Sequence, residues 1–117
     1  MGRGENRLGA SSLLQTYNKV GEITPDIEPK PLRQLFEVIQ ELHSQNLILA
    51  YHDRSDGGLF VTIAEMAFAG RCGIDLDISD LGEDSISALF NEEIGVVIQY
   101  HADKKQKIRN ILNSYNL

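Results

Sequence analysis

The chain of 117 residues has a single cysteine, Cys72, and fewer basic residues than acidic ones, 11 against 17. One cysteine excludes an intrachain disulfide and a multi-cysteine metal site, and it favours a reducing compartment. We expect the thiol of Cys72 to be buried in the protein. The formal charge of −6 lacks the basic surplus that binding to a phosphate backbone requires. We therefore do not expect nucleic acid as a partner.

Long hydrophobic runs are also missing. No run approaches the ~20 residues of a membrane span, and the first six residues lack the hydrophobic core of a signal peptide. We expect a cytoplasmic protein with no membrane partner. The composition, 42% hydrophobic and 24% charged with three prolines, is typical of a globular protein, and a chain of this length predicts one hydrophobic core. We treat residues 1–117 as a single domain, which the sheet described below predicts to be partial.

The chain begins with a loop, a short helix and a connection. Residues 1–9 hold three glycines, which predicts a glycine-rich loop. Residues 10–19 permit a short helix, with Gly21 as a stop. All three prolines fall within residues 22–31, which predicts an extended connection over the surface. Residues 32–117 then form the α/β core.

Hydrophobic periodicity predicts the helices of this core. A helix starting at Pro31 carries one apolar stripe as far as Leu42. Residues 59–69 are apolar almost all round, which predicts a helix sandwiched inside the core. A short helix at 85–90 and a last helix starting near Asp103 complete the set.

Three strands are predicted between these helices. The apolar run 47–51 predicts a buried strand, the alternation over 74–79 predicts a strand with one wet face, and residues 94–100 predict a third. This order indicates an α/β (α+β) fold, with a small mixed sheet and helices mainly on one face. The sheet looks incomplete at both ends, so its exposed edge could pair with a second copy in a homo-oligomer.

The segment YHDRSDGGLF, residues 51–60, concentrates polar residues where a strand turns into a helix. Sites collect at such strand ends, and the glycines allow close approach of a phosphate to helix amides. Two carboxylates would repel a bare phosphate, but Mg²⁺ binds carboxylate and phosphate oxygens together, and a serine hydroxyl can donate to phosphate. On spacing alone, a simple helix cap and glycine turn is the favoured alternative.

Several stretches resemble phosphoribosylformylglycinamidine synthase, in order and rough spacing. They are GRGENRLGASSL, LAYHDRSDGG followed by LFVTIAEMAFAG, and ALFNEEIGVVIQ, which together cover most of the chain. The long bacterial form is the most similar, and the match falls in its C-terminal synthetase-type domain. The resemblance implies a fold like the C-terminal domain of aminoimidazole ribonucleotide synthetase.

The resemblance also implies residue roles. Asp53 matches a magnesium ligand and Ser55 matches a residue that contacts the nucleotide, which implies Mg²⁺ and ATP as cofactors. Four further residues of the loop join the candidate set without individual roles. These are His52, Gly57 and Gly58 for the nucleotide and Asp56 for the metal.

Two other matching segments have open roles. The opening loop, with Gly4, Asn6, Arg7 and Gly9, either lies beside substrate phosphate or is a glycine-rich turn into the first helix. Asn91-Glu92-Glu93 also matches the family, but a solvated acidic turn is its favoured interpretation.

The implied parent reaction is the ATP- and glutamine-dependent amidation of formylglycinamide ribonucleotide in purine synthesis. The partners implied are the remaining domains of that enzyme, ATP and formylglycinamide ribonucleotide. One Asp-x-Ser loop supplies only one side of a phosphoryl-transfer site, so we expect the chain alone to be inactive. Alternatives are a related synthetase of the aminoimidazole ribonucleotide or selenophosphate type, which the run AYHDRSDGG disfavours, and a non-catalytic interaction module.

Overall fold

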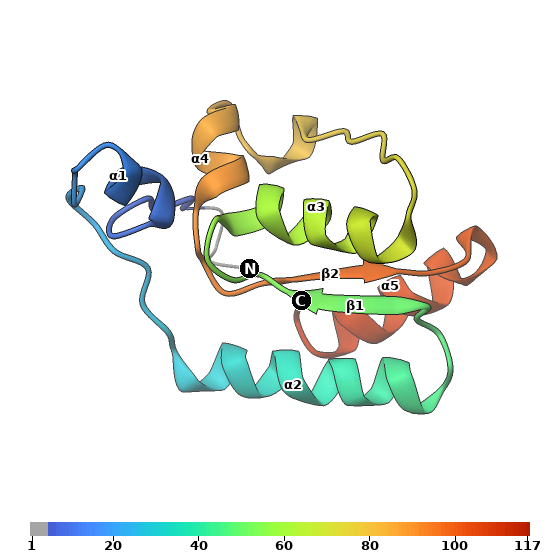
Figure 1. Ribbon diagram of the computed structural model, residues 1–117. Helices are drawn as coiled ribbons and strands as arrows, with labels where there is room; N and C mark the ends of the chain where they lie inside the picture. Colours follow the sequence, from blue (N-terminus) through green and yellow to red (C-terminus); the bar gives the residue numbers. More distant parts are fainter. Residues whose placement is uncertain (1–4) are drawn as a thin grey trace. The chain divides into compact units, whose positions relative to one another are not determined.

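The computed structural model describes residues 5–117, and Figure 1 traces the chain through them. The backbone divides into two compact units. The first contains His52–Val97 together with the N-terminal segment that ends at Asp26. The second contains Ile27–Tyr51 and Ile98–Leu117.

Strands β1 (Ala50–Asp53) and β2 (Val96–Gln99) form a two-stranded sheet. The N–H of Leu49 donates to the carbonyl oxygen of Gln99 at 2.7 Å, a pairing that is antiparallel. The α/β class is confirmed, but the sheet is antiparallel rather than mixed. The first strand begins three residues later than the apolar run 47–51 predicts, because buried Leu47 belongs to the turn that follows a helix.

Residues 74–79 are predicted as a strand, and this prediction is wrong. The segment runs as coil into the 3-10 turn η2 (Ser79–Leu81). A strand needs a neighbour for its backbone hydrogen bonds, and within residues 5–117 only β1 and β2 pair. Ile74 and Leu76 are consequently exposed, and so is Cys72, which corrects the expected buried thiol.

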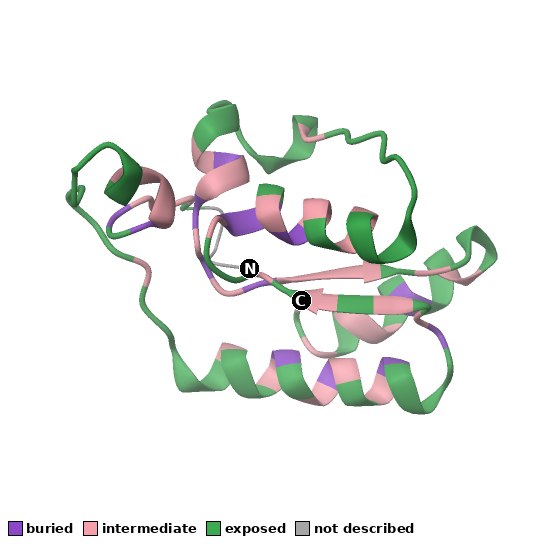
Figure 2. Cartoon of the chain, viewed as in Figure 1, coloured by how far each residue is buried: buried purple, intermediate pink, exposed green. Residues whose placement is uncertain are grey.

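Helices α1 (Ser12–Thr16), α3 (Gly58–Gly70) and α4 (Ser85–Phe90) belong to the first unit. The helix at 59–69 is confirmed, and α4 packs against it, with the rings of Phe60 and Phe90 5.4 Å apart. The prediction that this helix is buried on all sides is wrong, since Phe60 and Phe68 are 51% and 77% exposed. Figure 2 shows that its buried positions cluster near the first turn.

The second unit contains α2 (Pro29–Ser44), the 3-10 turn η3 (Ala102–Lys104) and α5 (Lys105–Ser114). Helix α2 packs against α5, and buried side chains recur along α2 (Figure 2). The hydroxyl of Tyr115 donates to Glu41 Oε2 at 2.9 Å. The helix predicted from Pro31 starts two residues earlier, because Pro29 and Pro31 both suit a first turn that lacks internal N–H partners.

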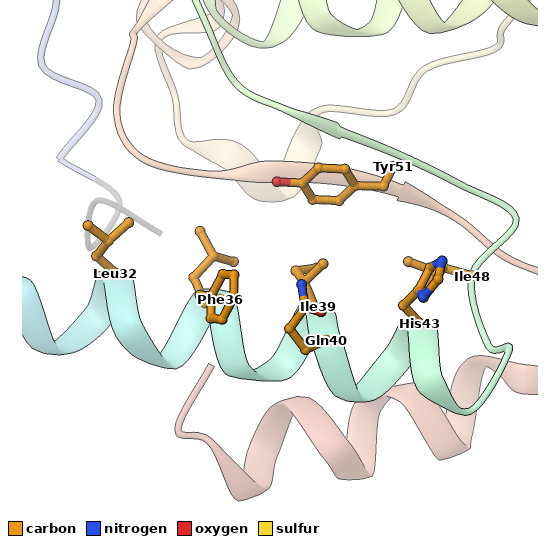
Figure 3. A pocket seen from close by; sticks show the side chains of 8 residues that line it. Leu32, Phe36, Ile39, Gln40, His43, Ile48 and Tyr51 are labelled. Atoms are coloured by element: carbon orange, nitrogen blue, oxygen red, sulfur yellow. The ribbon is translucent and has the colours of Figure 1, made fainter.

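An apolar groove of about 450 Å³ lies within the second unit. Figure 3 shows Leu32, Phe36 and Ile39 of α2 opposite Tyr51. The stripe predicted for this helix is therefore only partly buried, and Phe36 remains 64% exposed. Within the described residues, no helix is both long and apolar enough to cross a bilayer.

Candidate functional site

The segment from β1 to α3 forms a tight turn whose shape follows from its glycines. Gly57 and Gly58 adopt φ values of +85° and +69°, a region that residues with a Cβ rarely enter. The N–H of Gly58 donates to the carbonyl oxygen of Ser55 at 2.9 Å. The turn thus leads directly from the end of β1 at Asp53 into the first turn of α3.

Three candidate ligand residues of this turn face solvent. The carboxylate of Asp53 is 70% exposed, and Ser55 and Asp56 are exposed. Within residues 5–117 the side chains of Ser55 and Asp56 make no hydrogen bond or ion pair. Their oxygen atoms are therefore available to a ligand.

His52 is engaged by protein groups on both ring nitrogens. Nδ1 lies 2.7 Å from the carbonyl oxygen of Asp53, and Nε2 lies 2.8 Å from Glu65 Oε2. The hydrogen bond to the Asp53 carbonyl, supported by Glu65, raises the pKa of His52 above 6.5. The ring thus ties the end of β1 to α3.

Arg54, between the exposed residues, turns inward. Its backbone N–H donates to the carbonyl oxygen of Gly95 at 2.8 Å, and its side-chain Nη1 donates to Asn91 Oδ1 at 2.5 Å. Burial lowers the pKa of Arg54, while the nearby charge of Glu93 acts in the opposite direction. Its buried Nε has no hydrogen-bond partner within the described part of the chain.

The turn Asn91-Glu92-Glu93 is the structural centre of the site. Asn91 and Glu93 are 0% and 1% exposed, so the expected solvated acidic turn is wrong. Glu92 Oε1 accepts hydrogen bonds from the N–H groups of Gly57 and Ser12, both at 2.8 Å. This turn therefore binds the loop after β1 and the start of α1 together.

The opening loop also binds the Asn91-Glu92-Glu93 turn. Arg7 donates through Nε and Nη2 to the two carboxylate oxygens of Glu93, at 2.5 and 2.9 Å, and through Nη1 to Asp26. The hydrogen bonds to Glu93 and Asp26 raise the pKa of Arg7. Asn6 accepts from Asn91 Nδ2 at 3.1 Å. These side chains serve the protein's own contacts, and Gly4 lies outside the described residues.

The exposed carboxylates suit one side of a magnesium site. Among residues 5–117, no three His, Cys, Asp or Glu side chains converge on one point. Magnesium commonly keeps several waters and takes only one or two carboxylates together with substrate phosphates. Asp53 and Asp56 match that partial requirement, since both are exposed oxygen donors on one short turn.

Residues 2–117 match the family described as AIR synthase related protein, C-terminal domain. The chain belongs to this family. AIR synthase-related proteins are ATP-dependent synthetases, which agrees with the α/β architecture and with the general kind of enzyme expected from the sequence.

Sequence reasoning places the candidate ligands of this AIR synthase-related chain on one turn, and the structure brings them together there. It misses the turn's supports, above all Glu92 and Glu93. One signal for them is in the sequence: Arg54 is a lone cation between two aspartates, and a half-buried cation requires an anionic or polar partner. The Asn-Glu-Glu segment just before β2 supplies that partner.

Proposed function

We propose that this chain is a part of phosphoribosylformylglycinamidine synthase and that its 52–58 loop forms one side of a Mg²⁺-nucleotide site. The observation that carries the proposal is the alternation within the loop. Arg54 and Gly57 are bound to the 91–95 segment, whereas Asp53, Ser55 and Asp56 are exposed. Such a loop presents oxygen atoms to a ligand from a fixed backbone.

In this proposal each exposed side chain has a chemical task. The carboxylate of Asp53 binds Mg²⁺, which also accepts phosphate oxygens and so removes the repulsion between carboxylate and nucleotide. The hydroxyl of Ser55 donates to a phosphate oxygen. Asp56 adds a second oxygen ligand, directly or through water. His52 and the two glycines support the loop.

The chain supplies binding residues rather than a complete reaction centre. Phosphoryl transfer requires metal and hydrogen-bond donors around the whole transferring group, and this loop covers one side. The glutaminase and the second half of the nucleotide site belong to the remaining domains of the parent enzyme. Exposed apolar side chains on α2, among them Leu32 and Phe36, support association with those domains, and the sheet edge offers a route to a homo-oligomer.

Nucleotide binding with and without Mg²⁺ tests the proposal. Asp53→Asn should weaken Mg²⁺-dependent ATP binding by about tenfold or more, because an amide oxygen replaces a charged ligand. Asp75→Asn, an exposed aspartate outside the loop, is the matched control and should bind as the unaltered chain does. Isothermal titration calorimetry measures both. Equal affinities for Asp53→Asn and the control would refute the proposal, and a folded chain without Mg²⁺-dependent binding would favour an interaction module.

A further inference from the structure

Two anchors hold the candidate ligand loop, and only Ser55 and Asp56 lie between them. The first anchor is Arg54, whose backbone and guanidinium are bound by Gly95 and Asn91. The second is Gly57, whose N–H donates to Glu92 Oε1 at 2.8 Å. A two-residue span between fixed ends has little conformational freedom, so the anchors determine where the ligand oxygens point.

Glu92 does more than hold one anchor. The same Oε1 atom accepts from the N–H of Ser12 at 2.8 Å, so one carboxylate joins the start of α1 to the start of α3. Hydrogen bonds to an ionised acceptor are stronger than those between neutral groups. The carboxylate also lies where the amide groups at the start of α3 favour a negative charge.

We propose that Glu92 is a positioning residue that fixes residues 54–58 of the loop in the conformation in which Ser55, beside Asp53, binds the Mg²⁺-nucleotide. This inference rests on the proposed function. In this proposal Glu92 acts through the loop, because its Oε1 atom accepts hydrogen bonds from two backbone amides of the chain. Loss of the carboxylate releases Gly57 and leaves the loop with one anchor.

Hydrogen exchange on the 117-residue chain tests the positioning role without any ligand. The Gly58 amide is the reporter, because its hydrogen bond to the Ser55 carbonyl closes the loop and does not involve Glu92 directly. In Glu92→Ala this amide should exchange about tenfold faster. Glu92→Gln keeps an oxygen acceptor and should stay within about threefold of the unaltered chain. Glu83→Ala, an exposed glutamate, controls for the loss of a surface charge.

Calorimetric titration with Mg²⁺-ATP supplies the second readout. Glu92→Ala should bind about tenfold more weakly, with affinity restored in Glu92→Gln, as expected for an acceptor that orients the loop. If the exchange rate and the affinity do not change together in Glu92→Ala, the positioning role is wrong. If the unaltered chain binds no Mg²⁺-ATP, the proposed function fails. In that case the exchange rate of Gly58 still decides whether Glu92 fixes the loop.

Discussion

Replacing Asn91 with alanine is the sharpest test of the buried polar turn. Asn91 Oδ1 accepts hydrogen bonds from Arg54 Nη1 at 2.5 Å and from the Glu93 N–H at 3.2 Å. Its Nδ2 donates to the carbonyl oxygens of Ser87 and Ala88 at 2.5 and 3.2 Å. Nδ2 also donates to Asn6 Oδ1 at 3.1 Å, so the substitution removes five contacts from a side chain that is 0% exposed.

The expected cost is about 3 kcal/mol of unfolding free energy. A buried donor left without a partner costs roughly 1–3 kcal/mol, and a hydrogen bond to a charged group contributes about 1.5–3 kcal/mol. These contributions overlap, because water that enters the vacated space will satisfy some of the groups. For a chain of this size such a loss lowers the Tm by roughly 10 °C.

Urea denaturation followed by circular dichroism measures the change in unfolding free energy. Asn110→Ala is the matched control, because Asn110 is an exposed amide whose Oδ1 accepts a hydrogen bond from the side chain of Gln106. That control should shift the free energy by less than about 0.5 kcal/mol. If Asn91→Ala proves as stable as the control, the turn does not organise the site in the way described.

Two further substitutions probe the loop and a helix cap. Gly58→Ala should destabilise the chain by about 2 kcal/mol or more, because φ is +69° and the new Cβ would lie 2.6 Å from the Asn91 carbonyl oxygen. Gly73 has open space around it, so Gly73→Ala should leave the unfolding free energy nearly unchanged in the same denaturation assay. Equal losses of stability in the two variants would contradict this account. The hydrogen bond from the Ser87 hydroxyl lowers the pKa of Asp84 below 3.8, so the stability that Asp84 contributes is present above pH 3.8 and is lost as the pH falls through the lower folded-state value. Asp84→Asn should remove that acid-dependent loss in denaturation curves recorded from about pH 5 to about pH 2, and an unchanged pH dependence would argue against the cap.

The sequence predicts helices well wherever local signals are strong. The helix at 85–90 matches α4 (Ser85–Phe90), because Asp84 provides a side-chain cap at its start. Alternating residues such as those at 74–79 give a much weaker prediction. A strand depends on a partner strand that is often distant in the sequence, and local periodicity gives no information about that partner.

The sequence also predicts the candidate site only in part. Local sequence, through Asp53 and the two glycines, is enough to predict the exposed turn. Apart from the signal given by Arg54, the sequence does not reveal its supports, because Glu92 and Glu93 reach partners 80 or more residues away in the N-terminal segment. Adjacent glutamates resemble a solvated turn unless their partners are known, and only the folded backbone brings Arg7 and Ser12 to them.

The charges of the first unit separate into a balanced interior and an unbalanced surface. Inward, the guanidinium of Arg7 neutralises Glu93, and the charge of Glu93 also acts on Arg54. Outward, no lysine or arginine among residues 5–117 forms an ion pair with Asp53 or Asp56, and the ring Nδ1 of His52 lies 3.6 Å from Asp53 Oδ1. Carboxylates whose neighbouring arginine is turned away attract an external cation more strongly than a neutralised pair would. The inward turn of Arg54 therefore leaves the two aspartates free for the divalent ion of the proposed function.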